Sequence, residues 1–497
     1  MIKHKRKKYL KIGREIGFSY ILVFLQFIVG PLLIALLTRI LGAEKYGIYA
    51  LFSVFVGLFS LILQPGLSQY LITKLPSYEE KKWPLIFFSV ISFEAVFVFA
   101  ILTIFYFSPL GAMFLDVNKL ATYKSLLAVS MVIIFFSTIG GIYDYYYRAK
   151  QRINLANFME FFRLKGWALP LFVLFLLFRR FDLFQVFLAW GIFVVLTLLI
   201  YFWKTKKELF YFIRSGGAQY NLIKPALIFG FPLISTSILS WVIAASDRYI
   251  LNYFTSASVV GIYSLAYSLL GTLFTMAIIV SSVILPYFSE AWWKDKKQYS
   301  TLLNASLKYG LIMMAPGLVG AFVLRNELIT LISGPQYIAA APVVKTLLLY
   351  PLFLFLSSAL LQVLMVRNQN VFAGFVFLFG GILNIGLNIL LIPPYGMHGA
   401  AIATVLSYLL MFLLTLYKTR VHKLLDYNFV KLPRIVLSAI IMGAAISFIH
   451  PTHALTKLIT LAVGAGIYFA LLFLTKVFDK NELKLVRGAL FSFKKIL

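Results

Sequence analysis

The sequence consists of long apolar runs separated by short polar connections, most of which are basic. Many of these runs reach the roughly 20 residues that an α-helix needs to cross a hydrocarbon core. They lack the alternation over about ten residues that marks a membrane β-strand. Helices and closed barrels are the structures that satisfy their own backbone hydrogen bonds in lipid. The pattern therefore predicts an all-α polytopic membrane protein.

We predict fourteen membrane-spanning helices. Their expected ranges are 16–38, 47–72, 84–107, 125–147, 157–178, 183–203, 223–246, 259–288, 303–331, 343–366, 371–392, 399–417, 433–450 and 455–476. The connection between the sixth and seventh spans is long and basic, so we expect it to join two halves. The expected parts are a basic cytoplasmic N-terminus (1–15), an N-lobe (16–203), a cytoplasmic linker (204–222), a C-lobe (223–417), two additional helices (433–476) and a cytoplasmic C-terminal tail (477–497).

Lysine and arginine gather on alternate connections. When residues at span edges are counted with the neighbouring connection, 34 fall on one side of the membrane and 10 on the other. Basic connections favour the cytoplasmic side, so we expect both termini in the cytoplasm and a multi-pass protein of the plasma or inner membrane. The net charge of +29 then reflects topology and contact with anionic lipid, and we expect no nucleic-acid partner.

Composition agrees with a membrane protein and excludes several chemistries. Hydrophobic residues make up 61% of the chain and charged residues 13%, which is about half the charge of a soluble domain. There is no cysteine, so disulfides and thiol catalysis are excluded. The histidines lack metal-ligand spacing, and no phosphate-binding loop motif occurs. We expect no enzyme and no metal or cofactor, apart from a coupling ion, for which H⁺ and Na⁺ both stay open.

Two segments 214 residues apart are similar to each other: GIYALFSVFVG (47–57) and GIYSLAYSLLG (261–271). The tripeptide Gly-Ile-Tyr also occurs at 141 and 466, but there the later Leu and Gly are absent. A second match comes from the basic segments 148–151 and 366–369, which lead into the fifth and eleventh predicted spans. With six spans in each half, the matches predict parallel repeats related by a two-fold axis along the membrane normal.

Ionisable residues within or at the ends of the spans are the best candidates for function, because such groups usually pair or face a water-filled cavity. They are Arg39, Glu94, Asp144, Glu160, Arg163, Lys165, Asp247, Arg248 and Lys308. Glu160 and Arg163 lie one helical turn apart and could form a structural pair. Lys165 lies on nearly the opposite side of that helix from Arg163, where it could extend to the membrane surface.

Arg39 and Arg248 occupy equivalent outer ends of the first and seventh spans. In one interpretation, Asp247 and Arg248 form a local surface pair and Arg39 stabilises a helix C-terminus. In the other, both arginines approach the central axis and bind phosphate, for which the planar guanidinium is suited. Glu94 and Asp144 are candidates for binding a proton or a cation.

Four segments carry a resemblance to a known family. They are TRILGAEKYGIYALFSVFVGLFS (38–60), SDRYILNYFTSASVVGIYSLAYSL (246–269), SGPQYIAAAPVVKTLLLYPLFLFLSSALLQVLMVRNQN (333–370) and PPYGMHGAAIATVLSYLL (393–410). Together they resemble the polysaccharide transporter family, the Wzx-type lipid-linked oligosaccharide flippases of the MATE/MOP superfamily.

The resemblance implies two six-helix lobes around a cationic cavity that opens alternately to either side. The substrate would be an isoprenoid-diphosphate-linked oligosaccharide, flipped to the outer leaflet for cell-surface polysaccharide or glycan assembly. Residues expected to hold the diphosphate are Arg39, Arg163, Arg248, Lys165 and Lys308, and residues expected to bind a coupling ion are Glu94, Asp144, Glu160 and Asp247. We expect a monomeric transport unit that associates with a polysaccharide polymerase or glycosyltransferases.

Three alternatives stay open. A peptidoglycan-precursor flippase shares the fold and the two additional helices. A cation-coupled multidrug antiporter also shares the fold, although its cavity would be poorer in arginine and lysine. A membrane glycan ligase or polymerase would need a sizeable outer loop, whereas the longest predicted outer loop is 108–124 and carries few charges.

Overall fold

The computed structural model describes residues 2–64, 66–117, 121–178, 180–420, 431–449 and 451–478. In this part of the chain the regular structure is entirely helical. Ten helices are long and apolar enough to cross a membrane, and a bent pair makes an eleventh. The prediction of an all-α multi-pass membrane protein is confirmed, and the fourteen predicted spans are consistent with these helices. The predicted C-terminal tail lies outside the described residues from 479 onward.

The chain forms two compact units. The first contains Met1–Ser264 with Gly381–Ala403, and the second contains Leu265–Gly380 with Thr404–Leu497. The boundary at 264 falls within a helix, whereas the predicted lobes are joined by the linker 204–222. The lobe boundaries stay a prediction.

The first unit begins with α1 (Ile2–Ile62), which consists of two helices that meet at a kink, where two separate spans joined by a connection at 39–46 are predicted. The connection is reduced to a kink at Gly42, whose φ of 72° and ψ of 174° interrupt the helical backbone. Glycine adopts this positive φ without the steric cost that a side chain would impose. The polar residues around Gly42 therefore mark a change of direction and do not form a loop.

The predicted span 47–72 is also interrupted. The long helix ends at Ile62, and α2 (Leu67–Lys74) begins after Gly66, which has a φ of 66°. A Cβ atom at Gly66 would lie 2.8 Å from the carbonyl oxygen of Gly230. The two glycines thus allow the backbone before α2 to approach α9 (Tyr220–Phe254) closely.

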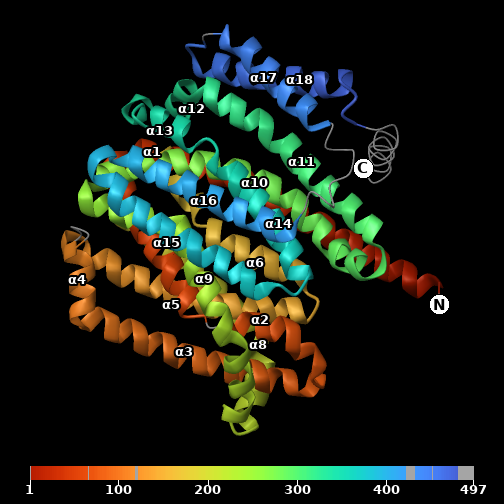
Figure 1. Cartoon of the computed structure of the whole chain (residues 1–497). Helices are drawn as coiled ribbons and strands as arrows, with labels where there is room; N and C mark the ends of the chain where they lie inside the picture. Colours follow the sequence, from red (N-terminus) through yellow and green to blue (C-terminus); the bar gives the residue numbers. More distant parts are fainter. Residues whose placement is uncertain are drawn as a thin grey trace. The chain divides into compact units, whose positions relative to one another are not determined.

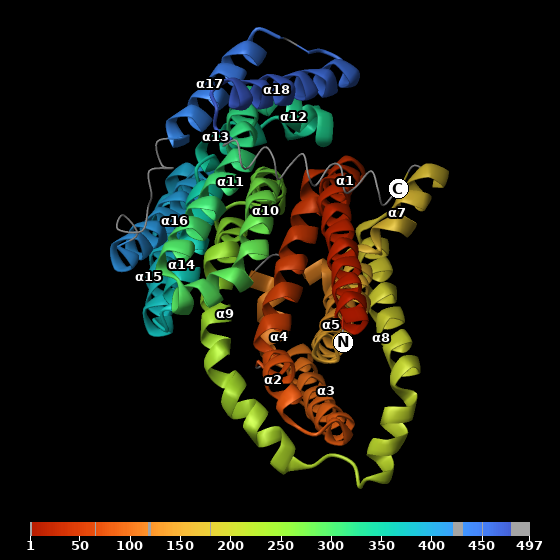
Figure 2. The same ribbon diagram turned by 90° about the vertical axis from the view of Figure 1, so that its right-hand side faces the viewer.

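The first unit continues with six further helices before α9, of which α3, α6 and α8 pack against α5. They are α3 (Trp83–Phe107), α4 (Pro109–Val117), α5 (Lys124–Ala149), α6 (Ile153–Lys165), α7 (Ala168–Phe178) and α8 (Leu183–Arg214), with 3₁₀ turns at Leu75–Ser77, Glu80–Lys82 and Ala121–Tyr123. The predicted span 157–178 is a bent pair, because α6 and α7 meet at 41°. Figure 2 shows α8 continuing through most of the predicted linker before a turn into α9. Gly216 and Gly217 provide that turn, with φ of 92° and 77°.

The two Gly-Ile-Tyr segments cross each other at close range within the first unit. A Cβ atom on Gly47 would lie 2.9 Å from the backbone nitrogen of Gly261, and one on Gly261 would lie 3.0 Å from that of Gly47. Each would also collide with a carbonyl oxygen, that of Ala257 or Ala43 respectively. Both helices thus present an Ala-x-x-x-Gly pair, the pattern that lets membrane helices approach closely. The contact is reciprocal, as expected for repeated segments.

Substitution of Gly261 by alanine is expected to destabilise the protein by about 2 kcal/mol, because the methyl group overpacks a backbone contact that cannot yield. Thermal unfolding of the purified protein in detergent measures the effect. The matched control is Gly466→Ala in the same tripeptide, because nothing lies within 4 Å of a Cβ atom there. Equal melting temperatures for the two variants would contradict a tight crossing at Gly261.

The second unit contains the rest of α10 (Ala257–Lys294) and a group of shorter helices. They are α11 (Lys296–Val323), α12 (Arg325–Ile332), α13 (Ala340–Leu347), α14 (Tyr350–Val366), parts of α15 (Asn370–Tyr395) and α16 (Met397–Thr419), α17 (Leu432–Ser447) and α18 (Ala454–Leu474), with a 3₁₀ turn at Pro335–Tyr337. In Figure 1, α17 and α18 lie side by side next to α11. The Tyr468 hydroxyl donates a hydrogen bond to the Ile312 carbonyl at 3.0 Å, which connects α18 to α11.

Candidate functional site

A buried ion pair joins α5 to α6 in the first unit. Arg163 Nη2 donates to Asp144 Oδ2 at 2.5 Å, and the two residues are only 5% and 1% exposed. The other carboxylate oxygen accepts a hydrogen bond from the Tyr201 hydroxyl of α8 at 2.5 Å. Three helices therefore meet at one carboxylate. Burying a charged group is costly, and pairing it with an opposite charge and hydrogen bonds offsets part of that cost.

The Arg163 guanidinium is only partly satisfied by this pair. Its Nε and Nη1 atoms are buried and have no hydrogen-bond partner in the part of the chain that the structure describes. Gly140 of α5 makes room for it, because a Cβ atom there would lie 2.5 Å from Nη1 and 3.3 Å from Cδ. The site thus holds a cation with two donor nitrogens that have no partner among the described residues, against a bare helix surface.

The predicted pairing of Glu160 with Arg163 is wrong. Glu160 instead accepts a hydrogen bond from Arg148 at 2.5 Å, and Arg148 also donates to Asn157 at 3.1 Å. The reason is that α5 and α6 are consecutive helices that turn back on each other, so that Arg148 faces the first half of α6. Arg163 lies further along and meets Asp144. Of the predicted ion-binding residues, Asp144 and Glu160 therefore each have an arginine partner.

A second buried polar group surrounds the segment 247–248. Arg248 donates from Nε to the Ser264 hydroxyl at 3.2 Å and from Nη1 to the Ala244 carbonyl at 2.9 Å. Asp247 lies 3.7 Å from Arg248 and accepts a hydrogen bond from the Tyr263 hydroxyl at 2.5 Å. The prediction of a surface pair is wrong, because Asp247 is fully buried and Arg248 is only 7% exposed.

Glu94 is a buried ionisable residue without a hydrogen-bond partner among the described residues. It lies on α3 with no exposed surface, and neither carboxyl oxygen has a hydrogen-bond partner among the described residues. Helix α3 packs against α5, α8 and α9. A buried carboxyl group without a protein partner is suited to bind a proton or a cation.

The other predicted basic residues have different surroundings. Arg39 is exposed and Lys165 is half-buried. Lys308 belongs to the second unit, where its ammonium group lies 5.4 Å from the ring centre of Tyr309 and 5.9 Å from that of Phe478. The structure therefore places the predicted diphosphate-binding residues in several environments, and their shared role stays a prediction.

Sequence reasoning missed the polar partners of these groups. Tyr201 and Tyr263 each hold a buried aspartate, and Glu208 accepts hydrogen bonds from Tyr146 at 2.6 Å and Lys150 at 2.5 Å. Tyrosines within apolar helices are usually packing or interface residues. Their roles here follow from contacts between helices, which the spacing along one helix does not reveal.

Gly140→Ala is expected to weaken the Asp144–Arg163 pair, because the added methyl group displaces the guanidinium. In a double-mutant cycle with Arg163→Met, we expect a coupling free energy of about 1 kcal/mol, because alanine at 140 is harmless once the arginine is gone. Thermal unfolding of the four proteins gives this value. Additive effects would show that Gly140 does not position Arg163.

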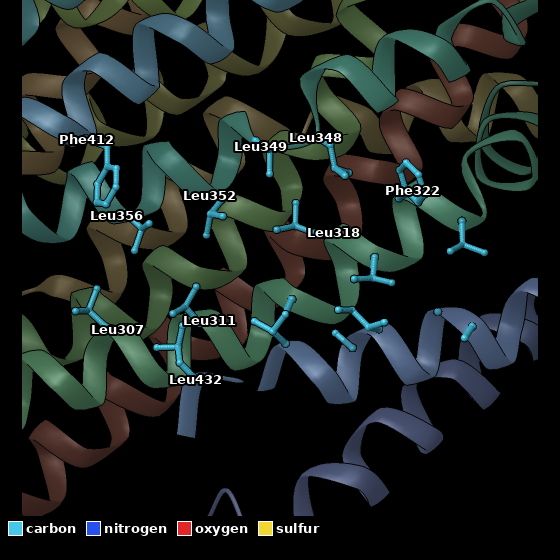
Figure 3. Close-up of a pocket in the computed structure, with 18 of the residues that line it drawn as sticks. Leu307, Leu311, Leu318, Phe322, Leu348, Leu349, Leu352, Leu356, Phe412 and Leu432 are labelled. Carbon is cyan, nitrogen blue, oxygen red and sulfur yellow. The ribbon is translucent and has the colours of Figure 1, made fainter. Parts of the chain in front are cut away.

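A large apolar cavity lies in the second unit among α11, α14, α16 and α17 (Figure 3). Its volume is about 950 Å³, and no charged residue lines it. Leu311, Leu352 and Phe412 are among the side chains that point into it. Such a cavity has room for a flexible hydrocarbon chain and offers nothing to a charged group.

Comparison with known proteins identifies the family. Residues 12–292 match the family described as "Polysaccharide biosynthesis protein", and this segment is more than half of the chain. The chain belongs to the polysaccharide biosynthesis protein family. The matched segment contains the Asp144–Arg163 pair, Glu94 and the Asp247–Arg248 group. The family predicted from the sequence is thereby confirmed.

Two curated relatives of this polysaccharide biosynthesis protein come from archaea. An uncharacterised membrane protein of Methanocaldococcus jannaschii is 25% identical over 484 residues, which cover 91% of this chain and 94% of the relative. A protein named "Probable low-salt glycan biosynthesis flippase Agl15" of Haloferax volcanii is 24% identical over 293 residues, which cover 58% of each chain.

Solved structures show the same fold. The lipid II flippase MurJ in an inward closed conformation has a TM-score of 0.75 at 18% identity, covering 93% of this chain and 99% of MurJ. An inward-facing multidrug resistance MATE transporter of the MOP superfamily has a TM-score of 0.64 at 15% identity, covering 80% of this chain and 95% of the transporter. The predicted MATE/MOP-like fold is therefore confirmed for this polysaccharide biosynthesis protein.

Proposed function

We propose that this polysaccharide biosynthesis protein flips an isoprenoid-diphosphate-linked oligosaccharide from the cytoplasmic to the outer leaflet by alternating access. A curated relative is named a glycan biosynthesis flippase, and a structure with the same fold is a lipid II flippase. These names support transport of a lipid-linked sugar and not chemistry on it. No covalent bond has to be broken for this activity.

The observation that carries the proposal is the buried Arg163, whose Nε and Nη1 atoms have no partner among the described residues and whose side chain lies against Gly140. A diphosphate cannot cross hydrocarbon alone, because stripping its charges of water is prohibitively costly. A guanidinium offers two parallel N–H donors that match phosphate oxygens. In the proposed mechanism Asp144 holds Arg163 while substrate is absent, and the diphosphate uses the free donors or replaces Asp144. Arg248 would serve as a second cation.

The second unit, taken by itself, contains an apolar cavity whose chemistry suits the hydrocarbon part of a lipid. Transfer of each methylene group from water to an apolar environment is favourable by roughly 0.8 kcal/mol. A long isoprenoid chain is therefore strongly stabilised in apolar surroundings. A cavity of about 950 Å³ without charged residues suits part of such a chain. Leu318 and Leu356, both lining this cavity (Figure 3), are suited to contact the tail.

Glu94 is the proposed binding site for a coupling ion, either H⁺ or Na⁺. We expect Glu94→Gln to leave the fold intact and to abolish any stimulation of flipping by an ion gradient, because the amide has nearly the same shape and cannot bind either ion in the same way. Flipping in proteoliposomes with imposed proton or sodium gradients measures this. A variant that responds to the gradient as the wild type does would contradict a coupling role for Glu94.

The substrate class is tested by mass spectrometry of lipid that co-purifies with the protein. We expect an isoprenoid diphosphate carrying several sugars to be enriched over the same preparation of the Arg163→Met variant. Enrichment of a peptidoglycan precursor would favour the first alternative. Enrichment of an amphiphilic drug with no bound glycolipid would refute the proposal in favour of an antiporter.

A further inference from the structure

The first unit also contains a cavity, at the place where α2 meets the beginning of α9, and polar residues contribute to its lining. Its volume is about 560 Å³, and Lys74 of α2 and Lys224 of α9 both line it. Tyr70 and Tyr78 also line it, and their hydroxyl groups form a hydrogen bond with each other at 2.9 Å. No carboxylate lines this cavity. Its chemistry is therefore that of an anion site, with two ammonium groups and a phenol pair.

Both lysines are available to a ligand. They are exposed, and neither forms an ion pair with a carboxylate among the described residues. In the tyrosine pair one hydroxyl donates to the other, so that one O–H remains for a further acceptor. Two cations and one neutral donor are a suitable set for a phosphate group.

Backbone contacts hold the two lysine-bearing helices next to each other. Gly66 and Gly230 bring the start of α2 against α9, since a Cβ atom at Gly66 would lie 3.0 Å from the carbonyl carbon of Gly230. The ring of Tyr70 packs on that of Phe229, with 6.0 Å between their centres. The two lysine-bearing helices are thus held together by glycine and aromatic contacts on the cavity side.

One wall of the cavity is apolar and faces outward. Ile228 follows Lys224 by one helical turn and is 65% exposed, so the ammonium group and the apolar side chain lie on the same helix face. Side chains arranged in this way occur where a membrane surface meets its headgroups. The predicted topology places the end of α2 and the beginning of α9 on the cytoplasmic side.

We propose that this cavity binds the phosphate group of a lipid at the cytoplasmic surface of the membrane. The phosphate would lie between Lys74 and Lys224 and accept a hydrogen bond from the tyrosine pair, while the hydrocarbon part runs past Ile228. An anionic phospholipid and an isoprenoid diphosphate share this chemistry. The site does not depend on the proposed transport activity, because it is defined by binding alone.

Native mass spectrometry of the full-length protein in detergent tests the site with three probes: dioleoylphosphatidic acid, farnesyl diphosphate and inorganic phosphate. The variant Lys74→Gln/Lys224→Gln is expected to bind both lipid probes on the order of tenfold more weakly than the wild type, from the loss of two surface cations. The matched control, Lys81→Gln/Lys82→Gln, removes the same charge from the neighbouring exposed turn outside the cavity and is expected to bind normally.

Tyr70→Phe provides a second test that leaves the charge unchanged, and it should weaken both lipid probes by several-fold. Stronger binding of the phosphatidic acid would identify a phospholipid site, and stronger binding of the prenyl diphosphate would identify a site for a substrate-like lipid; either supports the proposal. Equal losses in the two lysine variants would overturn it, as would inorganic phosphate binding as tightly as the lipids. If the wild-type protein binds the lipid probes as expected but flips no substrate, the proposed function is refuted and the binding site is not.

Discussion

Arg163→Glu is expected to abolish flipping of the lipid-linked oligosaccharide. The substitution removes the buried guanidinium and places a second carboxylate beside Asp144, in a position where the two carboxylates repel each other without solvent between them. Loss of one partner of a buried pair typically costs about 3–5 kcal/mol of stability. Flipping is measured with the purified variant in proteoliposomes, and stability by thermal unfolding in detergent.

A second variant separates the role of Arg163 in binding from its role in folding. In Asp144→Leu/Arg163→Met/Tyr201→Phe the whole polar group is replaced by apolar residues of similar size, a change that is often neutral or stabilising. We expect this triple variant to fold with a melting temperature near that of the wild type and to flip no substrate. Normal flipping by a folded triple variant would show that the pair is structural.

Arg248→Glu is expected to reduce flipping by on the order of a hundredfold, because a buried cation next to Asp247 becomes a second anion. Arg248→Lys keeps the charge but loses the Nε donor to Ser264, and we expect intermediate activity, since lysine does not reproduce the planar fork. Arg180→Glu is the control at an exposed arginine. Wild-type flipping by Arg248→Glu would remove this residue from the proposed site.

The helical architecture could be predicted from the sequence because a span needs only length and apolarity. Runs such as 84–107 and 125–147 match α3 and α5 to within two residues. The break inside the predicted span 47–72 was harder to predict. Gly66 changes the backbone direction through a single positive φ, which leaves the apolar pattern on either side intact. The Gly47–Gly261 crossing was visible as a repeat, and the structure adds that the two copies touch.

The partners of the charged residues could not be predicted in the same way. Spacing along α6 favoured Glu160 as the partner of Arg163, whereas the pair forms across helices with Asp144. Such choices depend on helix rotation and on small residues like Gly140 that open space for a long side chain. The sequence correctly drew attention to Asp144, Arg163 and Arg248 as ionisable groups in apolar spans. Their burial and their tyrosine donors required the structure.

In the proposed function, this chain moves a diphosphate-linked glycan lipid across a membrane. The most direct measurement is flipping of a fluorescent prenyl-diphosphate oligosaccharide in liposomes containing the purified protein, followed by access of a membrane-impermeant quencher. We predict that wild-type protein makes the inner-leaflet lipid accessible well above the rate of protein-free liposomes, and that the folded Asp144→Leu/Arg163→Met/Tyr201→Phe variant does not. If the inner-leaflet lipid becomes accessible no faster with wild-type protein than in protein-free liposomes, this chain does not flip the substrate.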